Sequence, residues 1–110
     1  MQELAAEFWA VDHGSDPDEA SVRSAFQPAE KYRVSGRQYP PKTSFVGTMI
    51  KGTCVVIRGQ CRISFTQGSV VLRSGQFAGL PGGPYQLEVE GNSDLEIVLV
   101  WELDRLGKLH

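Results

Sequence analysis

The sequence predicts an all-β domain, an antiparallel sandwich or barrel, preceded by a short N-terminal helix. From residue 31 to residue 103, short runs of β-branched and aromatic residues alternate with turns, and no helical segment separates them. The 12 Gly and 6 Pro residues favour many short elements over a few long helices.

Length and composition predict a single domain. Its 110 residues suffice for one core, with residues 1–30 as a helix and loop extension that packs on a barrel formed by residues 31–110. The net charge of -2 argues against a nucleic-acid binder. No apolar run approaches the ~20 residues that span a bilayer, and the N-terminus lacks the features of a signal peptide. We therefore expect a cytoplasmic protein without a membrane partner.

The N-terminal region has a helical pattern followed by a polar loop. Leu4, Phe8 and Val11 recur at helical spacing within residues 2–11, which predicts a helix whose apolar stripe faces the barrel. Residues 12–19 are a polar loop, and His13 in it has no companion ligands at a metal-binding spacing. Residues 21–26 fit either a short helix or a strand.

The first strands are interrupted by a pair of prolines. Proline supplies no hydrogen-bond donor to a sheet, so residues 39–42 should form a loop or an edge crossing before residues 43–50 resume the sheet. Residues 51–65 predict a hairpin with a two-residue turn at Arg58 and Gly59.

In that hairpin Cys54 and Cys61 would share one face as diagonal neighbours. Diagonal positions lie roughly 7–8 Å apart, too far for an unstrained disulfide. We therefore expect two buried free thiols.

The second half of the chain contains two further strand pairs. Residues 66–69 predict the turn of a second hairpin, residues 74–76 turn into the next strand, and residues 86–90 alternate in polarity. The most apolar run, residues 95–103, places apolar side chains on both faces, as in a central strand. The polar residues 104–110 should fray.

The spacing of Gly75, Pro81, Gly83 and Gln86 resembles the second sequence motif of the cupin superfamily, with Gln86 at the histidine position and Glu90 at the asparagine position. Gly59 resembles the end of the first motif. The resemblance covers residues 36–103 and implies a cupin-like jelly-roll β-barrel.

The resemblance does not extend to the metal ligands of cupins. The glutamate position of the first motif falls on Gly52, and its histidine positions fall on Phe45 and Gly47, or on Val46 and Thr48 with a gap one residue shorter. None of these side chains is a suitable ligand for Fe, Mn, Ni or Zn. We therefore expect no metal and no other cofactor.

A ligand pocket is the main functional hypothesis. Alternation puts Gln86 and Tyr85 on opposite faces of their strand, so either the polar face with Gln86 or, after a shift of one residue, Tyr85 points inward. An inward amide could orient a polar molecule. The other candidates are Tyr39 and Trp101, which could stack on a ring, and Lys51, which with Lys42 could meet an anion at the barrel mouth.

Three functions remain open. The first is a metal-free cupin-like domain that binds a small molecule or a protein partner, expected as a homodimer because cupins commonly pair. The second is a metal-independent enzyme, since residues 89–93 resemble part of compact nucleoside phosphorylases, and sugar-nucleotide epimerases share the fold; a Glu or Tyr would then have to be the base. The third is an interaction barrel filled by its own side chains.

Overall fold

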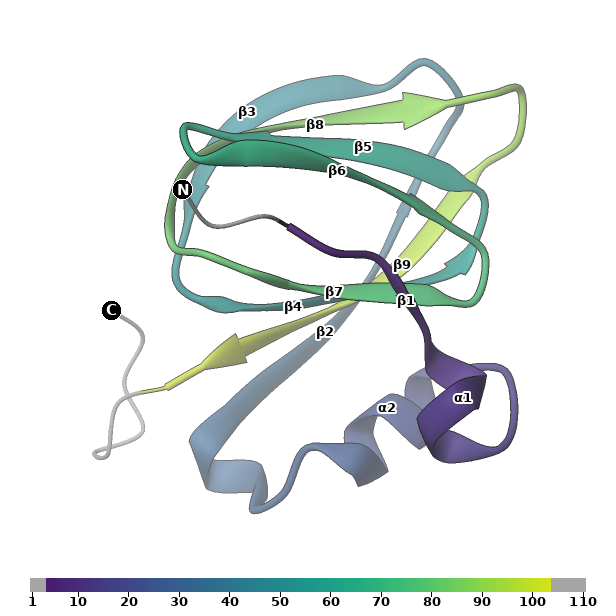
Figure 1. Cartoon of the computed structure of the whole chain (residues 1–110), viewed down its shortest axis with the longest axis vertical. Helices are drawn as coiled ribbons and strands as arrows, with labels where there is room; N and C mark the ends of the chain where they lie inside the picture. The colour runs from purple at the N-terminus through teal and green to yellow at the C-terminus, as the bar shows by residue number, and fades with distance from the viewer. Residues whose placement is uncertain (1–3, 104–110) are drawn as a thin grey trace.

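A computed structural model of the chain describes residues 4–103 and contains two antiparallel sheets that face each other (Figure 1). Sheet A has the strand order β1-β7-β4-β9-β2, and sheet B has the order β3-β8-β5-β6. The strands are β1 (Glu7–Phe8), β2 (Tyr32–Tyr39), β3 (Ser44–Met49), β4 (Gly52–Arg58), β5 (Gln60–Phe65), β6 (Gly68–Arg73), β7 (Gln76–Leu80), β8 (Gly83–Glu90) and β9 (Leu95–Glu102). This architecture confirms the predicted all-β antiparallel fold.

Strand β9 is the central strand that its apolar sequence predicts. It pairs with β4 on one side and with β2 along the whole length of β2, from Tyr32 opposite Glu102 to Tyr39 opposite Leu95. Ile97 and Leu99 face the interior between the sheets, whereas Val98 faces the outside of sheet A, where it is also buried. Alternating side chains of one strand thus enter two separate cores.

The two cores lie on opposite sides of sheet A. The inner core fills the space between the sheets, and the outer core lies between sheet A and the N-terminal helices, which cover that face in Figure 1. Trp9 and Val22 of the helical layer pack with Val55, Val98 and Val100 of the sheet. No helix among residues 4–103 is long and apolar enough to cross a membrane.

The predicted helix over residues 2–11 is wrong in its extent. Glu7 and Phe8 form the edge strand β1, and helix α1 (Trp9–His13) begins only after them, while residues 1–3 lie outside the described part. Phe8 and Val11 are 56% and 81% exposed, and Trp9 is the buried residue at 2%. Pairing of Phe8 with Gln76 on the open edge of β7 overrides the local helix propensity.

The second N-terminal segment, ambiguous in the sequence, is helix α2 (Glu19–Ala25). Asp18 and Ser21 form a capping box, in which each side chain accepts a backbone N–H of the other residue. The 3₁₀ helix η1 (Ala29–Lys31) leads from this layer into β2. The predicted proline interruption is present, because β2 ends at Tyr39 and β3 begins at Ser44.

The predicted hairpin over residues 51–65 is wrong. Strand β4 pairs with β7 and β9 in sheet A, whereas β5 pairs with β6 and β8 in sheet B, so the chain changes sheets at Gly59. Gly59 has a φ of +94°, which suits a corner as well as it suits a tight turn. The hairpin predicted around residues 66–69 is confirmed, since β5 and β6 pair directly.

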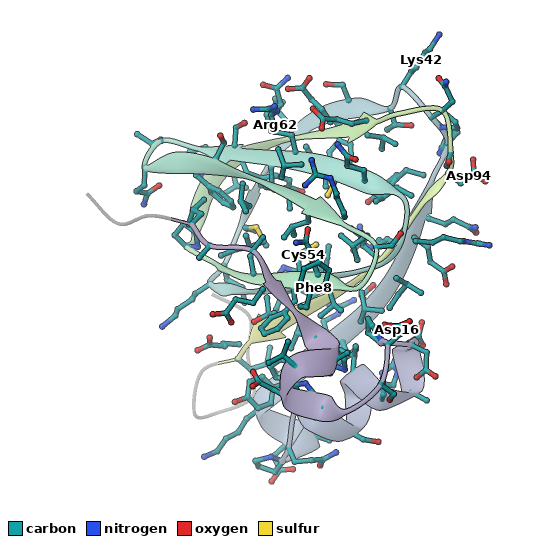
Figure 2. The ribbon with its side chains drawn as sticks, turned by 45° about the vertical axis from the view of Figure 1, so that its right-hand side comes forward. Phe8, Asp16, Lys42, Cys54, Arg62 and Asp94 are labelled. Atoms are coloured by element: carbon teal, nitrogen blue, oxygen red, sulfur yellow. The ribbon has the colours of Figure 1, made fainter. Side chains whose placement is uncertain are left out.

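The two cysteines are buried free thiols, as predicted, although not as neighbours on one hairpin. Cys54 comes from sheet A and Cys61 from sheet B, and both are fully buried in the inner core; Figure 2 shows Cys54 between the sheets. The Cys61 side chain, followed by burial, raises the pKa of the Cys54 thiol well above its usual value. The tail predicted to fray, residues 104–110, lies outside the described part.

Candidate functional site

A cavity of about 220 Å³ opens between the two sheets. Residues from β2, β9 and β7 of sheet A and from β3, β5 and β8 of sheet B contribute to its wall. Its lining combines aliphatic side chains with aromatic and polar ones: Arg37, Tyr39, Phe45, Thr48, Met49, Ile63, Leu80, Tyr85, Leu87, Leu99 and Trp101. Apolar walls with a few polar groups are typical of small-molecule sites.

Strand β2 supplies the charged part of this site. Residues two apart in a strand share a face, so Arg33, Ser35, Arg37 and Tyr39 lie on one face of β2. Arg37 and Tyr39 line the cavity, and the side chains of Arg33 and Arg37 are exposed. The Cζ atom of Arg37 lies 5.4 Å from the ring centroid of Trp101, and the Cζ of Arg33 lies 6.0 Å from it. These distances are those of cation–π contacts. The Nε of Arg37 donates a hydrogen bond to the Ser35 hydroxyl at 3.2 Å.

The aromatic part of the site is built around Phe45. Its ring centroid lies 5.1 Å from that of Tyr39 and 6.1 Å from that of Tyr85, which meets it edge-on. Gly47 stands opposite Tyr85 in the β3–β8 ladder, and a Cβ added there would meet the phenol ring at 3.1 Å. Because Gly47 has no side chain, the Tyr85 ring can lie against the backbone of β3 at this position of the wall.

The electrostatics of the site favour a neutral Tyr85. Burial first, and then the nearby Tyr39, raise the pKa of the Tyr85 phenol above its usual value, while the Arg37 charge acts in the opposite direction. At neutral pH the phenol is therefore protonated and able to donate a hydrogen bond.

Three of the five candidate binding residues from the sequence line the cavity: Tyr39, Tyr85 and Trp101. Gln86 lies on the outer face of sheet B, where its amide donates to the Ser44 hydroxyl at 3.4 Å. Of the two orientations of this strand, the structure thus has the one with Tyr85 inward. Lys51 is exposed in the connection between β3 and β4 and does not contribute to the cavity wall.

Sequence reasoning missed Arg37, Phe45 and Thr48 as wall residues. The alternation Arg33, Ser35, Arg37, Tyr39 was the available signal, but its meaning depends on the pairing of β2 with β9. The motif residues Gly59, Gly75, Pro81 and Gly83 all lie at turns or strand starts, and Gly75 adopts a φ of +85° between β6 and β7.

A second, wider recess of about 750 Å³ is lined by turn residues that include Gly59, Ser74 and Asp94. Two of its four charged side chains, Arg58 and Glu90, are in ion pairs, whereas Arg73 and Asp94 are in none among residues 4–103. Arg58 pairs with Glu96 at 3.2 Å, and Glu90, whose pKa is lowered by a hydrogen bond from Gln60 and by Arg62, accepts from both. The recess is also more open to solvent than the cavity between the sheets, which makes it the weaker candidate.

The residues present do not fit a cupin-type metal centre. The cavity wall carries guanidinium, phenol, indole and hydroxyl groups, and none of its residues is His, Cys, Asp or Glu. Among residues 4–103, no group of three or more such residues lies close enough together to hold a metal ion. The positions Gly52, Phe45 and Gly47, which match the ligand positions of the first motif, supply packing instead.

No protein-family model matches the sequence, and no curated protein matches it. Solved structures do match. The cupin domain of an XRE family transcriptional regulator from Enterobacter cloacae is 14% identical, with a TM-score of 0.62 over 94% of this chain and 100% of that one. The cupin domain of Schizosaccharomyces pombe Cnp3 is 10% identical, with a TM-score of 0.61 over 74% of this chain and 62% of that one.

The EutQ protein of Clostridium difficile is 20% identical, with a TM-score of 0.55. The match covers 66% of this chain and 56% of the EutQ chain, so this chain spans little more than half of EutQ. Identities this low show the fold and nothing about activity. Together with two facing antiparallel sheets and Gly75 and Gly83 at their turns, these likenesses show that the chain has the cupin fold.

Proposed function

We propose that the chain is a cupin-like binding domain that takes a small molecule in the cavity between the sheets, through organic side chains in place of a metal centre. The observation that carries the proposal is the cavity itself, with aliphatic residues along its wall and Arg37, Tyr39, Tyr85 and Trp101 as its polar and aromatic groups. An interaction barrel with a filled interior would need no such space.

Two further observations support binding ahead of catalysis. A phenol is protonated at neutral pH, and the raised pKa of Tyr85 moves it further from deprotonation, so it suits a hydrogen-bond donor better than a base. The similar cupin domain from Enterobacter cloacae belongs to a transcriptional regulator and is matched over its whole length, which fits a ligand-sensing module. A homodimer and a cytoplasmic location stay predictions.

Binding can be followed through Trp101, because the chain has only two tryptophans. A Trp9→Phe variant leaves Trp101 as the single indole, and it lies in the cavity wall. We expect at least one member of a panel of sugars, nucleosides and organic acids to change its emission and to raise the melting temperature, because a ligand of the native state stabilises it.

The matched controls are Gln86→Ala, which alters a side chain outside the cavity, and Ile63→Phe, which adds bulk to its wall. Ligand responses should survive the first change and disappear with the second. Met49→Phe is the substitute if Ile63→Phe unfolds, as overpacking a core costs typically about 1–3 kcal/mol. A ligand that binds the filled variants as well as the unaltered protein would place binding elsewhere and contradict the proposal, as would a panel with no binder.

A further inference from the structure

The cavity wall carries the positive charge of Arg37, which has no carboxylate within 4.0 Å among residues 4–103. Arg33 and Arg37 project from the same face of β2, and both guanidinium groups lie within 6.0 Å of the Trp101 ring centroid. These contacts hold the two groups beside the indole. The Nε of Arg37 is the only one of its donors with a hydrogen bond among residues 4–103, to the Ser35 hydroxyl.

Of the four other arginines among residues 4–103, three are paired with an acid and Arg73 is the exception. Arg23, Arg58 and Arg62 each lie 3.2 Å from a glutamate oxygen. Within residues 4–103, neither Arg33 nor Arg37 has a carboxylate within 4.0 Å, and the cavity wall contains no Asp or Glu. A cationic wall in a protein of net charge -2 is a local feature and not a consequence of overall composition.

The cavity is small, and part of its wall is aliphatic. Ile63, Leu80, Leu87 and Leu99 form its aliphatic wall, and 220 Å³ corresponds to about seven water molecules at the ~30 Å³ that each occupies in the liquid. A ligand that fits must therefore combine a compact apolar body with a single anionic group. A nucleotide or a polyphosphate is too large.

Resting on the proposed function, we infer that the ligand is a small organic carboxylate, held with its apolar body against Ile63, Leu87 and Leu99 and its carboxylate on Arg37. The planar guanidinium presents parallel N–H groups that match the two oxygens of a carboxylate. Tyr39 and the protonated Tyr85 add neutral hydrogen-bond donors, which bring no negative charge near the carboxylate. Arg33 pairs with Trp101 in the β2–β9 ladder, and its Cζ lies 6.0 Å from the indole ring centroid without contributing to the cavity wall.

Benzoate and its uncharged counterpart benzamide test the inference, because the two have nearly the same shape and differ in charge. Titration calorimetry of the full chain should show benzoate binding at least tenfold more tightly than benzamide. Arg37→Gln should remove most of this difference. Arg58→Gln, which removes an arginine paired with Glu96 outside the cavity, should leave the difference intact.

The outcomes separate the inference from the proposed function. Equal affinity for benzoate and benzamide, or an unchanged preference in Arg37→Gln, overturns the carboxylate and leaves small-molecule binding in place. Binding of neutral panel members with no response to benzoate, phenylacetate or butyrate overturns it in the same way. If inorganic phosphate competed as well as benzoate, the cavity would be a general anion site, and the inference of a carboxylate ligand would be overturned. If neither acids nor neutral molecules bind, the proposed function itself fails.

Discussion

Trp9 offers a direct test of how firmly the N-terminal layer belongs to the fold. Its side chain is 2% exposed, stacks on His13 with ring centroids 3.8 Å apart, and meets Phe77 of β7 edge-on at 5.4 Å. Replacing a buried Trp by Ala costs about 3–5 kcal/mol. At roughly 4 °C per kcal/mol for a domain of this size, Trp9→Ala should lower the melting temperature by about 12–20 °C.

Trp9→Phe should behave very differently. The indole Nε1 is buried and has no hydrogen-bond partner among the residues that the structure describes. Leaving a donor unsatisfied costs about 1–3 kcal/mol, and phenylalanine removes that cost while it keeps most of the aromatic contact. We therefore expect Trp9→Phe to change the free energy of unfolding by less than about 1.5 kcal/mol.

Urea unfolding monitored by far-UV circular dichroism measures both variants, with Val11→Ala as the control on the same helix. Val11 is 81% exposed, so its replacement should stay within about 0.5 kcal/mol of the unaltered protein. If Trp9→Ala lost less than about 1 kcal/mol, the helical layer would contribute little to folding, and the outer core would not be part of the cooperative unit.

Further substitutions and one thiol-labelling experiment probe other parts of the structure. Gly52→Ala should unfold the protein or lower its stability severely, because the added Cβ would overlap the backbone oxygen of Val100, whereas Gly79→Ala meets nothing within 4 Å; equal melting temperatures for the two variants would refute this packing. In the native state at pH 8 the fully buried thiols of Cys54 and Cys61 should resist iodoacetamide and react once urea unfolds the chain, and labelling at the rate of a free thiol would contradict their burial. The pKa of Cys54 is raised in the folded state, so its contribution to stability is complete below the usual thiol pKa of about 8.5 and declines as the pH rises above it. The free energy of unfolding of Cys54→Ala should therefore fall less steeply with pH in the alkaline range than that of the unaltered protein. An equally steep fall in both proteins would refute the raised pKa of Cys54. Gly47→Ala should displace the Tyr85 ring by a few tenths of an ångström, because the added Cβ would meet it. The variant should bind any ligand of the cavity with lower affinity while its melting temperature changes little. Unaltered affinity would exclude Tyr85 from the site.

Local sequence pattern was sufficient for the strands but not for their partners. The apolar run of β9 identifies a central strand because both of its faces carry buried side chains. Gly59, in contrast, has the same positive φ in a tight hairpin and at a corner between sheets. The corner forms because β7 and β9 pair with the two edges of β4 and leave none for β5. The strands β7 and β9 lie far from Gly59 in the sequence, so local pattern does not reveal this pairing.

The same limit applies to the site. Tyr39 and Trp101 were candidates because aromatic rings can stack on a ligand, and Tyr85 because alternation allowed it to point inward; all three line the cavity. It did not identify Arg37, which looks like an ordinary surface residue until β2 is placed beside β9 and the guanidinium meets the indole. Gln86 was attractive for its place in the motif, but Tyr85, Leu87 and Val89 occupy the inward positions of that strand.

The pairing of β2 with β9 has a consequence for the order of folding. Tyr32 lies opposite Glu102 and Tyr39 opposite Leu95, so the loop that this ladder closes contains more than half of the sequence. Closing so long a loop is slow, because the chain loses conformational entropy before the contacts between the two strands can form and stabilise it. Sheet B can assemble from residues 44–90 without waiting for β9, but Arg37 and Trp101 meet only when β9 enters between β4 and β2. The cavity between the sheets should therefore be completed late in folding.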